Sequence, residues 1–351
     1  MTGAPLVVTA TVGVLLACLL LGAALVLTKV GRERRSARRA ALVAPHRADL
    51  IAVSAGEDER GDRRSALAAA QGAARRALSE SIADILGKVR GLPAEQLVEV
   101  LGGHGTLAAA RADLRHRSPI RRAQAAQLLG LSRDADAVDP LVEALGDRRP
   151  EVRASVAYAL GLIGEPRAAG PLLRAVGAPA GGLPAGLAAD ALLGMGVGIS
   201  EALASALDDP DPRTRTVAAH LCGSASFTRP LPALREMLAR DPDLTVRETC
   251  AQALGSIGRA DDVEALARHT EAVHPQPLRR MCAGALGDLA EPSAVPTLAA
   301  LLHDPDPRLA EVAATSLVRL GPCGRAALDA ASDLRQVRSA LTLATLQGAM
   351  A

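Results

Sequence analysis

The 351-residue sequence contains no Trp, one Tyr and one Phe, so aromatic side chains cannot build its core. Leu, Ala and Val must fill the interior instead. Hardly any stretch shows the alternation of β-branched and aromatic residues that is typical of strands. Pro and Gly are frequent, with 22 and 32 copies, but they separate short apolar runs and so indicate many short elements joined by turns. These features predict an all-α fold.

Signatures of catalysis and metal binding are also missing. The five Cys residues include no C-x-x-C pair, which disfavours a zinc module and a disulfide scaffold, and we interpret the thiols as reduced and buried. The sequence has no H-E-x-x-H, no G-x-S-x-G and no G-x-x-x-x-G-K-[ST] motif. The seven His residues are scattered singly along the chain. We therefore expect no catalytic residue, no metal site and no cofactor, and predict that the protein is not an enzyme.

Residues 6–28 form a long apolar run, LVVTATVGVLLACLLLGAALVLT, that carries no charge. A helix of this length measures about 35 Å, which is enough to cross a bilayer. A cleaved signal peptide would need basic residues ahead of a shorter apolar stretch, and neither is present. Cleavage and lipidation at Cys18 are disfavoured because Cys18 lies in the middle of the run. The sequence thus predicts a transmembrane helix within residues 1–28.

A basic cluster follows the apolar run, within a predicted juxtamembrane linker at residues 29–46. Its members, which stand against the single acid Glu33, are Lys29, Arg32, Arg34, Arg35, Arg38 and Arg39. The positive-inside rule predicts a single-pass protein of the cell membrane, with its N-terminus outside and everything after the span in the cytoplasm. The cluster also suits anionic lipid headgroups. Six of the 40 basic and one of the 38 acidic residues lie before residue 40, which leaves 34 against 37. Nucleic-acid binding is therefore not expected.

A period near 31 residues organises the rest of the chain. Ala-rich amphipathic runs close at intervals of about 31 residues, at Gly130, Gly161, Gly194, Gly223, Gly255, Gly287 and Val318. Each unit combines a Leu-rich first helix, a turn with Asp and Pro, and an Ala-rich second helix. A single helix pair cannot bury its own apolar stripe, so neighbouring pairs must stack. We predict about seven pairs in residues 117–322, between a helical N-terminal cap at 47–116 and one C-terminal capping helix at 323–351.

These motifs resemble HEAT repeats, in the short bacterial variety also seen in phycobilisome lyase subunits. The layout, with a membrane helix before the repeats, is similar to bacterial membrane-anchored HEAT-repeat proteins. The resemblance implies a right-handed α–α superhelix of the armadillo-like kind. Iron-binding HEAT hydroxylases depend on paired His-Glu motifs, and this sequence has none. HEAT-like DNA glycosylases use a basic groove with aromatic residues, which also does not fit this composition.

The resemblance further implies structural roles for two positions in each unit. The signature Arg lies eight residues before the closing residue, at Arg122, Arg153, Arg215, Arg247 and Arg279. Gly186 and Ala310 replace it in two units. The turn Asp lies fourteen residues before the closing residue, at Asp147, Asp209, Asp241 and Asp304. Because a guanidinium can bond carboxylates and carbonyls of the next unit, we predict a structural ladder rather than a ligand site.

In HEAT arrays the second helices line the concave side. Positions three and seven residues before the closing residue are therefore predicted to meet a partner. The predicted partner-binding residues are Gln127, Tyr158, His220, Glu248, Gln252, Arg280, Glu311 and Thr315. Tyr158 is the only aromatic residue in this strip and is the best anchor candidate. The alternative for Tyr158 is that it fills a gap in the core.

The sequence therefore favours a non-catalytic, membrane-anchored adaptor or scaffold. It would hold a cytoplasmic or membrane-associated partner protein near the inner leaflet, for example a membrane enzyme such as a glycosyltransferase, and anchoring would raise the local concentration of that partner. The alternative is a lyase-type or cofactor-handling HEAT protein that acts on a chromophore- or metal-bearing partner, because the repeats are of the variety found in chromophore lyases.

Overall fold

The computed structural model describes residues 36–178 and 181–350, together with residues 21, 22, 26, 29, 30, 33 and 34, and it describes side chains up to residue 343. The predicted transmembrane span, residues 6–28, lies almost wholly outside the described residues. No helix within the described residues is both long enough and apolar enough to cross a bilayer. The described residues form helices and no strand, which confirms the all-α prediction. The chain divides into two compact units, Met1–Ala110 and Arg111–Ala351.

The first unit is a small helical body. After a helical stretch at residues 36–43, it contains η1 (Ala44–His46), α2 (Arg47–Ala55), α3 (Asp62–Ala68), α4 (Gly72–Leu86), α5 (Leu92–Gly103) and the start of α6 (Thr106–Asp113). Leu67, Leu78 and Leu97 have no exposed surface and form its core. Arg39 donates to Ser81 Oγ at 3.1 Å and to Asp84 Oδ2 at 2.7 Å. This part of the predicted linker is therefore helical and is bound to α4.

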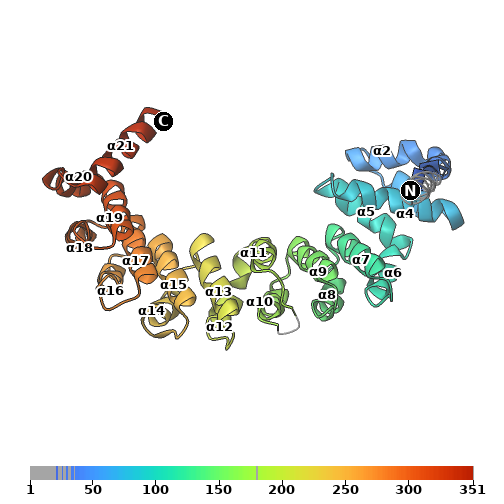
Figure 1. Ribbon diagram of the computed structural model, residues 1–351. Coiled ribbons are helices and arrows are strands. Elements are labelled where there is room, and N and C mark those ends of the chain that lie inside the picture. Colours follow the sequence, from blue (N-terminus) through green and yellow to red (C-terminus); the bar gives the residue numbers. More distant parts are fainter. Residues whose placement is uncertain are drawn as a thin grey trace, which may run out of the picture. The chain divides into compact units, whose positions relative to one another are not determined.

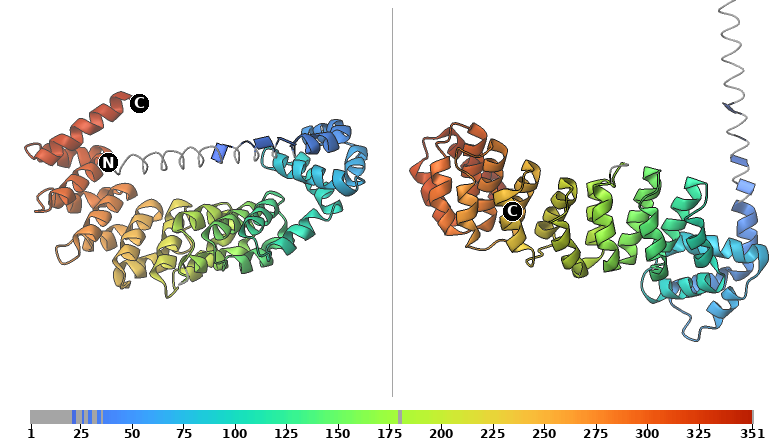
Figure 2. Two further views of the ribbon diagram at one scale, coloured as in Figure 1. Left: turned by 45° about the vertical axis from the view of Figure 1, so that its right-hand side comes forward. Right: turned by 90° about the horizontal axis from the view of Figure 1, so that it is seen from below.

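The second unit is a row of stacked helix pairs (Figures 1 and 2). The first helices of repeats 1–7 are α6, α8 (Val138–Ala144), α10 (Ala169–Val176), α12 (Ser200–Ala206), α14 (Leu231–Arg240), α16 (Asp262–Arg268) and α18 (Val295–Leu301). The second helices are α7 (Pro119–Leu131), α9 (Pro150–Ile163), α11 (Ala185–Leu193), α13 (Pro212–Ser224), α15 (Leu244–Ile257), α17 (Gln276–Leu289) and α19 (Pro307–Arg319). The 3-10 turns η2 (Ala135–Ala137), η3 (Pro166–Ala168), η4 (Gly196–Ile199) and η5 (Pro292–Ala294) lead into α8, α10, α12 and α18.

The C-terminal region differs from its prediction. Two helices, α20 (Gly321–Ala330) and α21 (Arg335–Met350), replace the single capping helix expected at residues 323–351. α20 packs against α18 and α19, and α21 packs against α19. Val337 and Ala340 of α21 are buried. The prediction was wrong because the turn at residues 331–334 interrupts the segment, and the two helices continue the array as an eighth pair.

Glycine allows the second helices of neighbouring repeats to approach closely. A Cβ atom placed on Gly130, Gly223 or Gly255 would lie 2.6 to 2.8 Å from the Cα atom of an alanine in the next second helix. Real Cβ atoms essentially never come so close to another heavy atom. The approached alanine stands two residues before the closing residue of the next repeat, as Ala253 does before Gly255. The closing Gly of the sequence pattern therefore has a packing role.

Repeat 3 departs from this geometry. Gly161 approaches Ala191, which places the closing position of repeat 3 at Leu193 rather than at the predicted Gly194. Leu193 is 45% exposed. A Cβ atom placed on Gly194 would lie nearest to the carbonyl oxygen of Gly161, at 2.8 Å, rather than to an alanine of repeat 4. In addition, α11 has nine residues, whereas the second helices of the other six repeats have 13 or 14.

Candidate functional site

Three of the predicted ladder arginines pair with a predicted turn aspartate of the next repeat, and we call each such pair a rung. Arg122 bonds Asp147 through two parallel contacts of 2.5 and 2.9 Å. Arg215 bonds Asp241 in the same way, with both contacts at 2.8 Å. In the third rung, Nη2 of Arg279 lies 2.5 Å from Oδ2 of Asp304. In each case an arginine of one second helix reaches the turn of the following repeat.

The turn aspartates also organise their own turns. Oδ1 of Asp147 accepts the backbone N–H of Arg149 at 2.9 Å, and Asp241 accepts that of Asp243 at the same distance. Burial alone would raise the pKa of Asp147, but hydrogen bonds from Arg122 and the Arg149 N–H outweigh it and hold the pKa below its usual range. The carboxylate is therefore held in its charged form by both the rung and the turn.

The remaining ladder residues form no rung among the described residues. Arg153 donates Nη1 to the carbonyl oxygen of Asp147 at 2.9 Å, and its Nε is buried without a partner. Arg247 donates Nε to the carbonyl oxygen of Leu238 at 2.9 Å. In the sequence, Ala180 and Val273 occupy the positions where the pattern of the next unit would place an aspartate. Asp209 accepts the N–H of Asp211 at 2.9 Å, but repeat 3 supplies no arginine for it.

Other arginine–aspartate pairs also join repeats at positions that the sequence pattern did not indicate, and two of them involve a largely buried aspartate. Nε of Arg235 lies 2.5 Å from Oδ1 of Asp262, whose side chain is almost completely buried. Arg280 was predicted to bind a partner, but its Nε donates to Oδ2 of Asp306 at 2.8 Å. Both pairs span 26 or 27 residues, close to the spacing of the rungs. A search for Arg and Asp at this separation would have found them.

The predicted partner strip lies on the second helices, which form one side of the row in Figure 1. Six of its members are exposed: Gln127, Tyr158, His220, Gln252, Glu311 and Thr315. Glu248 and Arg280 are half-buried. Tyr158 is 57% exposed and so does not fill a gap in the core. Burial, with a smaller contribution from the charge of Asp243, raises the pKa of Glu248 above its usual range.

The thiols offer little chemistry in the folded array. Cys222, Cys250 and Cys282 are buried, and burial raises the pKa of each thiol to about 12. Cys323 is exposed, so the prediction of buried thiols was wrong at this position, where α20 begins. Cys18 lies outside the described residues. Within the described part of the chain, no group of three or more His, Cys, Asp or Glu residues is arranged to hold a metal ion.

A buried serine and histidine in the first unit were not singled out by the sequence pattern. Thr106 donates to Ser79 at 3.0 Å, Ser79 bonds Nδ1 of His104 at 2.9 Å, and Nε2 of His104 bonds the carbonyl oxygen of Leu67 at 3.0 Å. Because a carbonyl can only accept, Nε2 of His104 carries a proton and donates it to Leu67. Ser79 and His104 are both buried. We interpret the chain of bonds as a structural link between α3, α4 and α5.

Comparison with known proteins identifies the repeats. The model of the HEAT-repeat family matches residues 107–192, 200–277 and 270–345, which is more than half of the chain. The chain belongs to the HEAT-repeat family. The interval between the first two matches, residues 193–199, coincides with the end of repeat 3, where the register of this HEAT array shifts. The last match includes most of the eighth pair.

Solved structures agree on the fold of this HEAT-repeat chain. A mutant of Kap121p is 14% identical, with a TM-score of 0.55, and the alignment covers 82% of this chain and 35% of Kap121p. Kap121p bound to Nup53p is 13% identical, also with a TM-score of 0.55, and 85% and 36% of the two chains are covered. The chain thus spans about a third of the length of Kap121p. No curated protein sequence matches the chain.

Proposed function

We propose that the protein is a membrane-anchored, non-catalytic scaffold that binds a partner protein along the second helices of its HEAT repeats. The observation that carries this proposal is the strip of exposed side chains on those helices. Gln127, Tyr158, His220, Gln252 and Thr315 recur at one position in five repeats and remain exposed. Such a strip offers hydrogen-bonding groups and one aromatic anchor at regular intervals.

The contacts between repeats support this role, because they hold the strip at fixed spacing. The glycine contacts join successive second helices, the rungs join a second helix to the turn of the next repeat, and six of the eight strip residues remain exposed. Preorganised surfaces bind with a smaller loss of conformational entropy. The complex of Kap121p with Nup53p is an example of a solenoid of this fold bound to another protein.

The membrane anchor is supported by the sequence. The uncharged run at residues 6–28 is long enough to span a bilayer, and the basic residues that follow it favour a cytoplasmic position for the repeats. Anchoring would raise the effective concentration of a partner that is itself at the membrane. A membrane-associated enzyme such as a glycosyltransferase is a partner of the expected kind.

Site-specific photo-cross-linking in cells tests the proposed surface. A photoreactive phenylalanine analogue is placed at Tyr158 or Gln252 in the full chain. Matched control positions are Glu201 and Glu264, which are exposed on the first helices α12 and α16. We expect one and the same protein to be cross-linked from Tyr158 and Gln252 but not from the control positions.

The second step measures affinity for the cross-linked partner. Tyr158→Ala should weaken binding by about ten-fold, because a central aromatic anchor contributes strongly to an interface. Glu201→Ala serves as the control and should leave the affinity unchanged. Equal cross-linking from the first and second helices, or unchanged affinity of the Tyr158→Ala protein, would contradict the proposed surface.

A further inference from the structure

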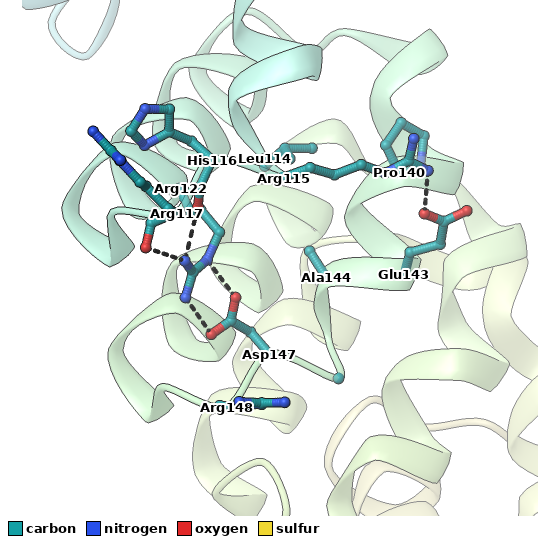
Figure 3. A pocket seen from close by; sticks show the side chains of 11 residues that line it. Leu114, Arg115, His116, Arg117, Arg122, Pro140, Glu143, Ala144, Asp147 and Arg148 are labelled. Carbon is teal, nitrogen blue, oxygen red and sulfur yellow. Dashed lines mark hydrogen bonds and ion pairs between the residues drawn. The ribbon is translucent and has the colours of Figure 1, made fainter.

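A hollow of about 480 Å³ lies where α6 ends and the turn of repeat 2 begins (Figure 3). Its walls include Arg115, Arg117, Arg122 and Arg148, together with Glu143 and Asp147. Both acidic residues are already neutralised, because Glu143 bonds Arg115 at 2.6 Å and Asp147 forms the rung with Arg122. Neither Arg117 nor Arg148 has a carboxylate within ion-pairing distance in the described part of the chain. The hollow therefore carries an uncompensated positive charge.

The turns of repeats 1 and 2 differ in charge from those of repeats 4, 5 and 7. At the two positions before the second helix, repeats 4, 5 and 7 carry Pro-Asp, whereas repeats 1 and 2 carry Arg117-Ser118 and Arg148-Arg149. In the later repeats the Asp caps its helix; Asp211, for example, accepts the N–H of Arg213 at 2.8 Å. No side chain caps α7 or α9. The first turn of α9 contains Glu151, whereas the first turn of α7 contains no acidic residue, so the positive end of α7 is left without a negative partner.

An exposed apolar residue follows Arg117 closely in the sequence. Ile120, in the first turn of α7, is 68% exposed and is followed by the exposed Arg121. The corresponding residues of repeats 2, 4, 5 and 7 are all polar: Glu151, Arg213, Thr245 and Arg308. Burial in the core therefore does not explain an isoleucine here. An exposed apolar side chain that is close to arginines in the sequence suits the boundary between lipid headgroups and acyl chains.

We propose that this basic edge, formed by Arg117, Ile120, Arg121, Arg148 and Arg149, binds the anionic headgroup surface of a bilayer. The guanidinium groups bond lipid phosphates in pairs of contacts, and Ile120 enters the interfacial layer. The inference rests on the proposed membrane anchoring, which keeps the repeats near a bilayer, and it adds a second point of contact. An acidic polypeptide would satisfy the arginines but gives no reason for the exposed isoleucine.

The absence of Trp from the sequence provides a direct test. Ile120→Trp makes a full chain with a single tryptophan, which is placed in nanodiscs of neutral lipid or of neutral lipid mixed with phosphatidylglycerol, each containing brominated acyl chains. We expect the fluorescence of this tryptophan to be quenched in the anionic discs only. Val273→Trp is the control, since Val273 is 79% exposed in the turn of repeat 6, and it should stay unquenched in both.

A set of charge variants tests the arginines. Replacing Arg117, Arg121, Arg148 and Arg149 with Gln in the Ile120→Trp chain should lower the quenching about three-fold or more. The matched control replaces four other exposed arginines, Arg213, Arg229, Arg259 and Arg308, and should leave the quenching unchanged. Equal quenching in neutral and anionic discs, or no quenching in either, overturns the proposal.

The same chain distinguishes a failure of the proposed membrane anchoring from a failure of the proposed basic edge. A chain that does not enter nanodiscs contradicts the proposed anchoring, and the same Ile120→Trp chain is then mixed with anionic vesicles that contain brominated lipid. Quenching in these vesicles supports lipid binding by the basic edge even though the anchoring proposal has failed. No quenching overturns both the anchoring and the basic-edge proposals. If poly-glutamate shifts the emission while anionic lipid does not, the edge takes an acidic polypeptide and the lipid proposal is wrong.

Discussion

Repeats 3 and 5 follow the same helix-pair plan but are joined to their neighbours in different ways. Repeat 5 receives the rung from Arg215 to Asp241, and Gly223 and Gly255 bring its second helix close to those on either side. Repeat 3 supplies no arginine to Asp209, and its Gly177 approaches the side chain of Asp211 in repeat 4 rather than the second helix backbone. The stability of a solenoid is approximately a sum of repeat and neighbour contributions. Repeat 3 therefore lacks contacts with its next neighbour that repeat 5 has, although its sequence is still recognisable as a repeat.

The largest expected effect comes from removing a rung. Asp241→Ala should lower the free energy of unfolding by about 3 kcal/mol, because it leaves the largely buried guanidinium of Arg215 without its partner. Asp209→Ala removes the same kind of turn bond but no rung, and should cost about 1 kcal/mol. Urea denaturation followed by circular dichroism measures both changes. Equal losses of unfolding free energy would show that the rung between Arg215 and Asp241 does not stabilise the contact between repeats 4 and 5.

Close packing at glycine should give an intermediate effect. Gly255→Ala places a Cβ 2.8 Å from the Cα of Ala285, so the helices must separate, and we expect a loss of about 2 kcal/mol. The matched change Gly284→Ala, in α17, meets nothing closer than 3.9 Å and should stabilise the helix by about 0.5 kcal/mol. Melting temperatures of the two proteins report the contrast. A gain for both would contradict the assigned role of the closing glycine.

The smallest effects are expected in the pH dependence of stability, which sharpens the comparison between two carboxyl groups. The pKa of Asp147 is held low, so its contribution to stability is present above its ordinary pKa and is lost as pH falls through the lowered value. Asp147→Asn should therefore be less stable than the natural chain at pH 7, with the difference shrinking below about pH 4. Thermal melting at a series of pH values measures this convergence.

Glu248 provides the opposite case. Its pKa is raised by burial, so its contribution is present in acid and is lost as pH rises through the raised value. Glu248→Gln should accordingly melt slightly higher than the natural chain at pH 7 and show no advantage at low pH. If the stability differences of the Asp147→Asn and Glu248→Gln proteins changed with pH in the same way, the opposite pKa shifts of the two carboxyl groups would be contradicted.

Much of the array could be predicted from the sequence because its period repeats a physical requirement. Each repeat needs a Leu-rich first helix and an Ala-rich second helix. The closing Gly recurs because second helices of neighbouring repeats must approach closely. The register of repeat 3 was misjudged because Leu193 and Gly194 imitate the closing pattern one residue late. The turn before α21 was missed because Ser332 and Asp333 are a weak signal in an Ala-rich stretch.

The site could be predicted only in part. The partner strip follows from helical periodicity, so six of its eight residues are exposed as expected. The pairing of Arg280 with Asp306 depends on how far one repeat is rotated against the next, which no single repeat encodes. Likewise, Arg153 and Arg247 match the Arg pattern but form no rung, because a rung needs a carboxylate from a different repeat.

The three buried thiols can report the opening of individual repeats in this array. Cys222, Cys250 and Cys282 belong to repeats 4, 5 and 6, one in each second helix. With pKa values of about 12 and no access to solvent, they react with alkylating reagents only when their own repeat opens. Cys323, exposed at the start of α20, is an internal reference for reagent access. Mass spectrometry after pulsed alkylation of the native chain can thus measure the rate at which each of three consecutive repeats opens.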